Sequence, residues 1–151
     1  MCYTIHFIQE IEAVNLEASM KQAALETLKN EQAVPGSLTL VLTDEATIQR
    51  LNYEYAGLNQ PTDVLAFPGE EVDPDDEGIY FGDIIIALPI AERQASAAGH
   101  ALQAEVNLLT IHGTLHLLGY DHADRDEKEA MWAKQSAILT SLGLDSIELG
   151  E

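Results

Sequence analysis

The sequence contains few cysteines and few basic residues, and each shortage excludes a class of protein. Cys2 is the single cysteine among 151 residues, so no intramolecular disulfide can form and a reducing compartment is expected. Lysine and arginine number 7 against 26 aspartates and glutamates, a formal net charge of −19. This is the opposite of the basic surface typical of nucleic-acid-binding proteins. On composition alone the acidity favours a solubilising role, and a polyanionic partner would need a locally favourable site.

Long apolar runs, internal repeats and a glycine-rich phosphate loop are also missing. No stretch approaches the ~18 consecutive apolar residues of a membrane span, and the first residues lack a basic segment followed by an apolar run. We therefore expect a cytoplasmic protein. With 46% hydrophobic residues, the chain is expected to form one domain over residues 1–151, with a core that needs no disulfide or structural metal.

Segments with strand periodicity and segments with helix periodicity follow one another along the chain. Residues 79–87 are nearly continuous in hydrophobicity, so we expect this strand in the middle of a sheet, buried on both faces. Residues 70–77 hold six carboxylates and predict a surface loop, without the ligand spacing of an EF-hand site. Further strands are expected at 3–8, 38–42 and 61–68. Helices are expected at 16–30, 89–99, 100–119 and 124–140, and another is expected from a cap at Thr43 to residue 57.

Residues 105–122 carry three of the five histidines. His112 and His116 are four residues apart, which places both imidazoles on one face of a helix with Cβ atoms roughly 5–6 Å apart. Gly119 suits the left-handed residue that ends a helix, after which the chain can turn and bring His122 to the same ion. Three imidazoles leave one tetrahedral position of zinc open, as in catalytic sites. The spacing therefore predicts one zinc ion per chain, bound by His112, His116 and His122, which are also the predicted catalytic residues.

The residue after the first histidine of this motif bears on the class of reaction. In zincin metalloproteases that residue is the glutamate general base, whereas here it is Gly113, so peptidase activity is not expected. Glycine costs a helix about 1 kcal/mol relative to alanine. Two reasons for Gly113 remain open: room for a substrate or a neighbouring chain beside the metal, or close packing of the helix.

The segments His112–His122, Pro61–Pro68 and Gly82–Ile86 together resemble the bacterial YbeY family of rRNA maturation endoribonucleases. The resemblance implies an α+β fold with a four-stranded mixed sheet and about five helices. It implies a zinc site on a central helix and the turn after it, and cleavage of single-stranded RNA. It also implies a cytoplasmic role in maturation of small-subunit (16S) rRNA and in ribosome quality control, with ribosomal RNA and small-subunit components as partners. No DNA or membrane partner is expected, and a monomer is favoured.

Two positions depart from the family pattern. Ala56 stands where the family usually has an arginine, and Ala66 where it usually has a serine. The loss of an arginine that could bind phosphate or a developing charge lowers the expected efficiency of RNA cleavage. Asp121 and Asp63 are candidates for orienting an imidazole or contacting substrate. Asp83 is a further candidate at the edge of the site, with a structural hydrogen bond inside a buried strand as the alternative.

The sequence leaves the nucleophile and two other functions open. Phosphodiester cleavage at a single metal can use a water molecule or the RNA 2′-hydroxyl as nucleophile. A zincin-like metallohydrolase acting on peptides or amides is favoured by the turn glycine and opposed by Gly113. A non-catalytic, zinc-containing ribosome-assembly factor is favoured by Ala56 and by the net charge of −19.

Overall fold

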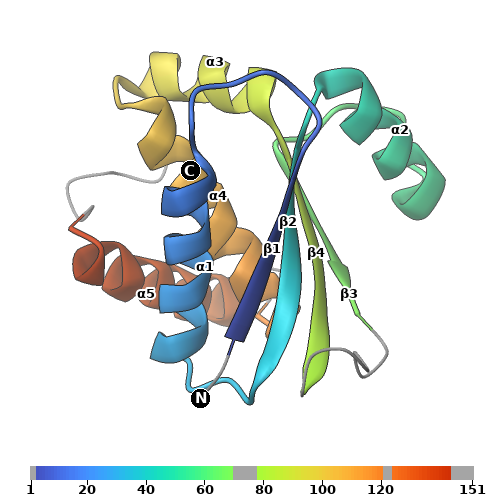
Figure 1. Cartoon of the computed structure of the whole chain (residues 1–151). Helices are drawn as coiled ribbons and strands as arrows, with labels where there is room; N and C mark the ends of the chain where they lie inside the picture. The colour runs from blue at the N-terminus through green and yellow to red at the C-terminus, as the bar shows by residue number, and fades with distance from the viewer. Residues whose placement is uncertain (1–2, 70–77, 121–123, 144–151) are drawn as a thin grey trace.

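Four strands and five helices follow one another in the order expected from the sequence (Figure 1). The computed structural model describes residues 3–69, 78–120 and 124–143. The predicted loop at 70–77 lies outside the described residues. None of the described helices is long and apolar enough to cross a membrane. The elements are β1 (Tyr3–Gln9), α1 (Glu17–Asn30), β2 (Gly36–Thr43), α2 (Glu45–Ala56), β3 (Val64–Pro68), β4 (Ile79–Ala87), α3 (Leu88–Ala98), α4 (Leu102–Leu117) and α5 (Arg125–Ser141).

The four strands form one mixed sheet in the order β1-β2-β4-β3. The pairs β1–β2 and β2–β4 are parallel, and β3 runs antiparallel to β4. The expected α+β fold with a four-stranded mixed sheet and five helices is confirmed. β4 has a strand on each side, and Ile84, Ile85 and Ile86 on it are all buried, as predicted for a strand covered on both faces.

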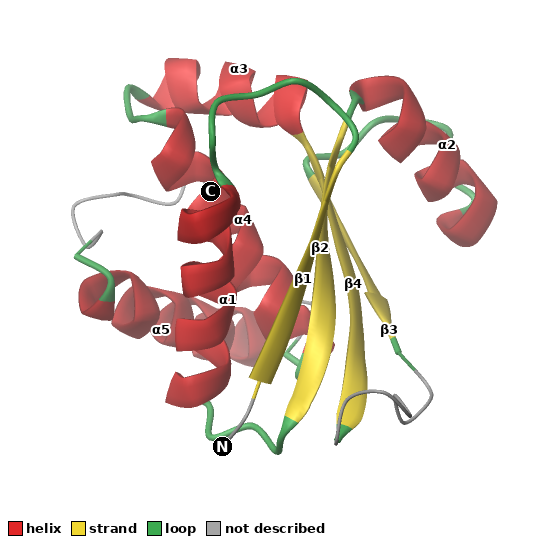
Figure 2. Ribbon diagram, in the orientation of Figure 1, coloured by secondary structure: helices red, strands yellow, loops and turns green. Residues whose placement is uncertain are grey.

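Helices cover both faces of the twisted sheet, and α4 lies at the centre of the larger layer (Figure 2). α1, α4 and α5 lie on one face and α2 on the other. Side chains alternate between the two faces along β4. Ile84 and Ile86 pack in the cluster that contains residues of α1 and α4, whereas Ile85 packs with Ile48 of α2.

Two helix starts show how well local capping could be predicted. Asp124 caps α5 as expected, because its carboxylate accepts a hydrogen bond from the Glu127 N–H at 2.8 Å. The prediction of Thr43 as the cap of α2 was wrong by one residue: Thr43 ends β2 and is buried. The cap is Asp44, which accepts from the Thr47 N–H at 2.7 Å. Hydrogen bonds from Thr47 lower the pKa of the Asp44 carboxyl below its ordinary value.

Candidate metal centre and substrate cleft

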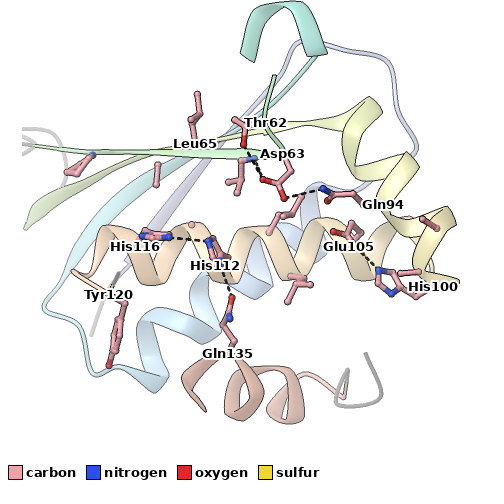
Figure 3. Close-up of a pocket in the computed structure, with 18 of the residues that line it drawn as sticks. Thr62, Asp63, Leu65, Gln94, His100, Glu105, His112, His116, Tyr120 and Gln135 are labelled. Carbon is pink, nitrogen blue, oxygen red and sulfur yellow. Dashed lines mark hydrogen bonds and ion pairs between the residues drawn. The ribbon is translucent and has the colours of Figure 1, made fainter. Parts of the chain in front are cut away.

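One side of α4, a largely apolar helix, carries three polar residues that line a cleft. Glu105, His112 and His116 are separated by seven and four residues, so they share a face of the helix. This face forms one wall of a cleft of about 900 Å³ (Figure 3). The other wall is formed by residues 62–66 and Pro68, at and before β3, and by Gln94, Ala97 and Ala98 of α3. The sheet edge and two helices thus enclose His112 and His116, two of the three predicted metal ligands.

The side chains of His112 and His116 meet in this cleft. Their Nε2 atoms are 3.1 Å apart, and the ring centroids are 4.6 Å apart. Two nitrogen ligands that are each 2.0–2.1 Å from a tetrahedral zinc lie roughly 3.3–3.4 Å apart. The two nitrogens are therefore close to the separation that one shared ion requires, as the i, i+4 spacing predicts.

The other ring nitrogen of His112 has a buried partner on α5. His112 Nδ1–H donates to Gln135 Oε1 at 3.0 Å, and Gln135 is only 1% exposed. An amide oxygen only accepts hydrogen bonds, so with Gln135 Oε1 as the acceptor Nδ1 carries the ring proton, and in the neutral ring the lone pair is on Nε2. A histidine in that tautomer is ready to bind a metal through Nε2. The donor set therefore fits zinc. Sequence reasoning missed Gln135, although a glutamine among the inward-facing residues of α5 is a signal that could have indicated it.

The third predicted ligand, His122, lies outside the described residues, as does Asp121. Among the described ranges, no group of three or more metal-ligating side chains comes together. α4 ends at Leu117, and Gly119 has a φ of +102° with its N–H on the His116 carbonyl at 3.0 Å. The chain therefore turns at Gly119, as predicted, shortly after His112 and His116.

Tyr120 holds the chain immediately after this turn. Its hydroxyl donates to Glu31 Oε1 at 2.5 Å, and Glu31 also pairs with Lys134 of α5 at 3.5 Å. The hydrogen bond to Glu31, together with burial, raises the pKa of Tyr120 to about 12, so the phenol stays neutral and can donate at physiological pH. This contact links the turn to the end of α1 and, through Lys134, to α5. No local pattern in the sequence indicates this contact, because Tyr120 and Glu31 are far apart along the chain.

Gly113 lies on α4 directly against Ile84 of β4. A Cβ atom at this position would be 2.7 Å from Ile84 Cγ2, which is closer than packed side chains approach. Of the two reasons left open by the sequence, this distance supports close packing. Gly113 is also among the residues that line the cleft.

The structure places the other two described candidate carboxylates on different faces of the sheet. Asp63 lines the cleft, where its Oδ1 accepts from the Val64 N–H at 2.8 Å and its Oδ2 is 3.4 Å from Gln94 Nε2. Asp83 alternates with Ile84 on β4 and so faces the α2 side. It accepts a hydrogen bond from the Tyr80 hydroxyl. That bond agrees with the structural alternative considered for Asp83.

The far end of the cleft contains a pair that sequence reasoning missed. His100 Nε2 and Glu105 Oε1 are 2.6 Å apart, and their side chains are only 15% and 8% exposed. Figure 3 shows this pair beyond Gln94, at the opposite end of the cleft from His116. Ala56, at the position where the resemblance implies an arginine, is the exposed last residue of α2.

Comparison with known proteins identifies the family. The family model described as endoribonuclease YbeY matches residues 5–143. The chain belongs to the YbeY family. The endoribonuclease YbeY of Pelotomaculum thermopropionicum is 42% identical over 133 residues, covering 85% of this chain and 88% of the relative. That of Desulforamulus reducens is 38% identical over 152 residues, covering 96% and 99%.

A solved structure agrees with the fold. The solution structure of TM1509 from Thermotoga maritima superposes with a TM-score of 0.59 at 26% identity and covers 97% of each chain. The family resemblance stated from the histidine motif and the two strand motifs is therefore confirmed. The family match spans residues 5–143, so it includes most of β1 and all of the other strands and helices of the described residues.

Proposed function

We propose that this chain is a zinc-dependent endoribonuclease that cleaves single-stranded RNA during maturation of small-subunit rRNA. Its class, a hydrolase acting on RNA, follows from membership in the YbeY family. The metal, its ligands His112, His116 and His122, and a ratio of one ion per chain are our proposals. The observation that supports them is the 3.1 Å separation of the two Nε2 atoms, with the His112 tautomer fixed by Gln135.

The residues around the site suit phosphodiester cleavage better than peptide hydrolysis. A bound zinc ion supplies Lewis-acid chemistry for phosphoryl transfer. Gln135 keeps the lone pair of His112 Nε2 directed into the cleft. Gly113 occupies the position of the zincin glutamate, so α4 provides no carboxylate there to act on a peptide. The cleft of about 900 Å³ is within the range of sites that enclose small ligands, so it can accept a nucleotide of a single strand.

The cellular setting is part of the same proposal. Ribosomal RNA and small-subunit components are the proposed partners, without DNA or a membrane, and the cytoplasm is the proposed compartment. The protein is proposed to act as a monomer with a single domain over residues 1–151. Asp121 and Asp63 are kept as proposed groups that orient a ligand or contact the substrate.

The decisive experiment combines zinc content with an RNA cleavage assay on three proteins. The wild type should contain about one zinc per chain and cleave single-stranded RNA. His116→Ala should lose zinc under mild chelation and lose cleavage, with an unchanged helical circular dichroism signal, because the core does not depend on the metal. His6→Ala is the matched control, because His6 lies on the exposed side of β1, away from the cleft, and this variant should behave like wild type.

Each alternative outcome has a distinct meaning. Full zinc content and activity in His116→Ala would rule out the proposed ligand set. Loss of the helical signal together with zinc would make the site structural. Turnover of peptides or amides without RNA cleavage would favour the metallohydrolase, and binding to small ribosomal subunits without cleavage would favour the assembly factor.

A further inference from the structure

We propose that the end of the cleft formed by Asp63, Gln94, His100 and Glu105 is a nucleobase subsite. It accepts a base that presents an exocyclic amino group, such as cytosine, in preference to uracil. The proposal rests on the proposed function, because it takes single-stranded RNA as the substrate, and it adds a site that selects one nucleotide of that strand.

This end of the cleft and the two histidines lie at different positions along α4. Glu105 and His112 are seven residues apart on α4, which corresponds to about 10 Å along the helix axis. Between them the cleft is lined by aliphatic residues, Leu108 and Leu109 of α4 and Val64 of β3. A flat base can lie against such surfaces with its edge directed to the polar end. A strand whose phosphate lies beside His112 and His116 can therefore place a neighbouring base against these aliphatic residues, toward the end of the cleft that contains Glu105.

The polar groups at this end are mainly acceptors. Asp63 uses Oδ1 to fix the start of β3 through the Val64 N–H at 2.8 Å, whereas its Oδ2 has only a long contact of 3.4 Å with Gln94. A carboxylate can accept at about four lone-pair positions, so this oxygen can take a further donor. Carboxylates pair with the amino group of cytosine, whereas the O4 carbonyl of uracil offers a second acceptor and is repelled.

The charge of the cleft also favours an RNA strand that has its phosphate at the histidines and a base at the acidic end. Among the described residues that line it, none is a lysine or an arginine, and Asp63 and Glu105 are both at one end. Glu105 is held by His100 at 2.6 Å and is almost fully buried, so this wall is fixed in place. The Asp63 carboxylate repels a phosphate and leaves a base edge as the part of RNA that this end can bind. The phosphate is thereby directed to the histidine end.

A binding experiment on the zinc-free protein tests the subsite without relying on catalysis. The probes are two 2′-O-methyl trinucleotides, which resist cleavage, with cytosine or uracil at the central position. Wild type should bind the cytosine probe about fivefold or more tightly than the uracil probe, the low end of the discrimination for a well-made base contact. Asp63→Asn keeps an oxygen for the Val64 N–H but replaces Oδ2 with an amide that donates, so the preference should disappear or reverse.

The matched control is Asp44→Asn, which makes the same substitution and the same change in net charge at the exposed cap of α2. Asparagine caps a helix about as well as aspartate, so the control should fold and keep the wild-type preference. Gln94→Lys is a second test that does not touch the start of β3. Gln94 is exposed on α3, and an added donor beside Asp63 should also reduce the preference for cytosine.

The outcomes separate this subsite from the proposed function. Equal binding of both probes by wild type, no measurable binding of either, or an unchanged preference in both cleft variants would overturn the subsite. A cytosine preference that is lost in the cleft variants would support it even if the zinc-loaded protein cut no RNA, which would count against the proposed function alone. RNA cleavage without any preference would leave the nuclease and exclude the subsite.

Discussion

A buried polar side chain is explained only when its hydrogen bonds are accounted for, and Gln135 illustrates this at the scale of one residue. Burial of an amide without a partner costs about 1–3 kcal/mol in proteins. Gln135 is 1% exposed among Met131, Ile138 and Leu139 of α5, where an apolar residue would pack well. Its bond to His112 Nδ1 removes that cost and fixes the ring that faces the cleft.

The first prediction follows from this contact. Gln135→Met keeps the volume but removes the acceptor, so zinc affinity should fall by about 10–100-fold, the usual effect of losing a partner that orients a ligand. Gln135→Glu retains an acceptor for Nδ1–H and should restore most of the affinity. Competition with a chelator measures both constants. If Gln135→Met binds zinc as tightly as wild type, Gln135 has only a packing role.

The residue scale also shows what the sequence could and could not predict about the site. The meeting of His112 and His116 was predictable because helical spacing alone brings them together. The partners Gln135 and Glu31 were not, because they are 23 and 89 residues away from His112 and Tyr120 and come from other helices. Only the packing of α1 and α5 against α4 creates these contacts. His122 and Asp121, outside the described residues, remain predictions.

At the scale of elements, the position of α4 against the sheet depends on Gly113. A methyl group there would have to displace Ile84, a fully buried side chain at the middle of β4. The absence of a side chain lets the helix that carries the two histidines lie close to the central strand. The loss of helix propensity at a glycine, about 1 kcal/mol, is the cost of that close approach.

We predict that Gly113→Ala lowers the free energy of unfolding by roughly 1–2 kcal/mol, because overpacking outweighs the gain in helix propensity. In an Ile84→Ala background the same substitution should be neutral or stabilising, since the neighbour that it would strike is gone. Urea denaturation of the four proteins in this double-mutant cycle gives the coupling. An equal cost of Gly113→Ala in both backgrounds would show that Ile84 is not the obstacle.

Element positions were predictable where a local pattern determines them, and less so where distant segments pair. The alternation in β1 and the apolar run of β4 gave the strands, and Gly99 and Gly119 gave the ends of two helices. Periodicity alone could not give the strand order β1-β2-β4-β3 or the antiparallel direction of β3, since these depend on non-local pairing. The mixed sheet was expected only through the family resemblance.

At the scale of the whole molecule, the few cations are already engaged. Five of the seven lysines and arginines form ion pairs with carboxylates, and several of these pairs link successive turns of one helix. They are Lys21, Arg50, Arg93, Arg125 and Lys134. A phosphate backbone approaching this chain therefore meets a net charge of −19 with few basic contacts to offset it.

The last prediction is that RNA cleavage by the zinc-loaded protein becomes faster as salt is added. Most nucleic-acid-binding proteins lose affinity with salt because their cations release counterions from the backbone. Here long-range repulsion dominates the approach, and salt screens repulsion as it screens attraction, so kcat/KM should rise between about 20 and 200 mM monovalent salt. Zinc content is measured at each salt concentration so that loss of metal is not mistaken for screening.

Ala56→Arg provides the matched variant for this prediction, at the position where the family resemblance implies an arginine. If the new side chain contacts a phosphate, cleavage should increase most at low salt, and the slope of log kcat/KM against log salt should become more negative by about one counterion. If it stays at the exposed end of α2, it adds one charge to the net −19 and the slope should scarcely change. A wild-type rate that falls steadily with salt would mean that cations of this chain bind the RNA directly and that the net charge does not govern its approach.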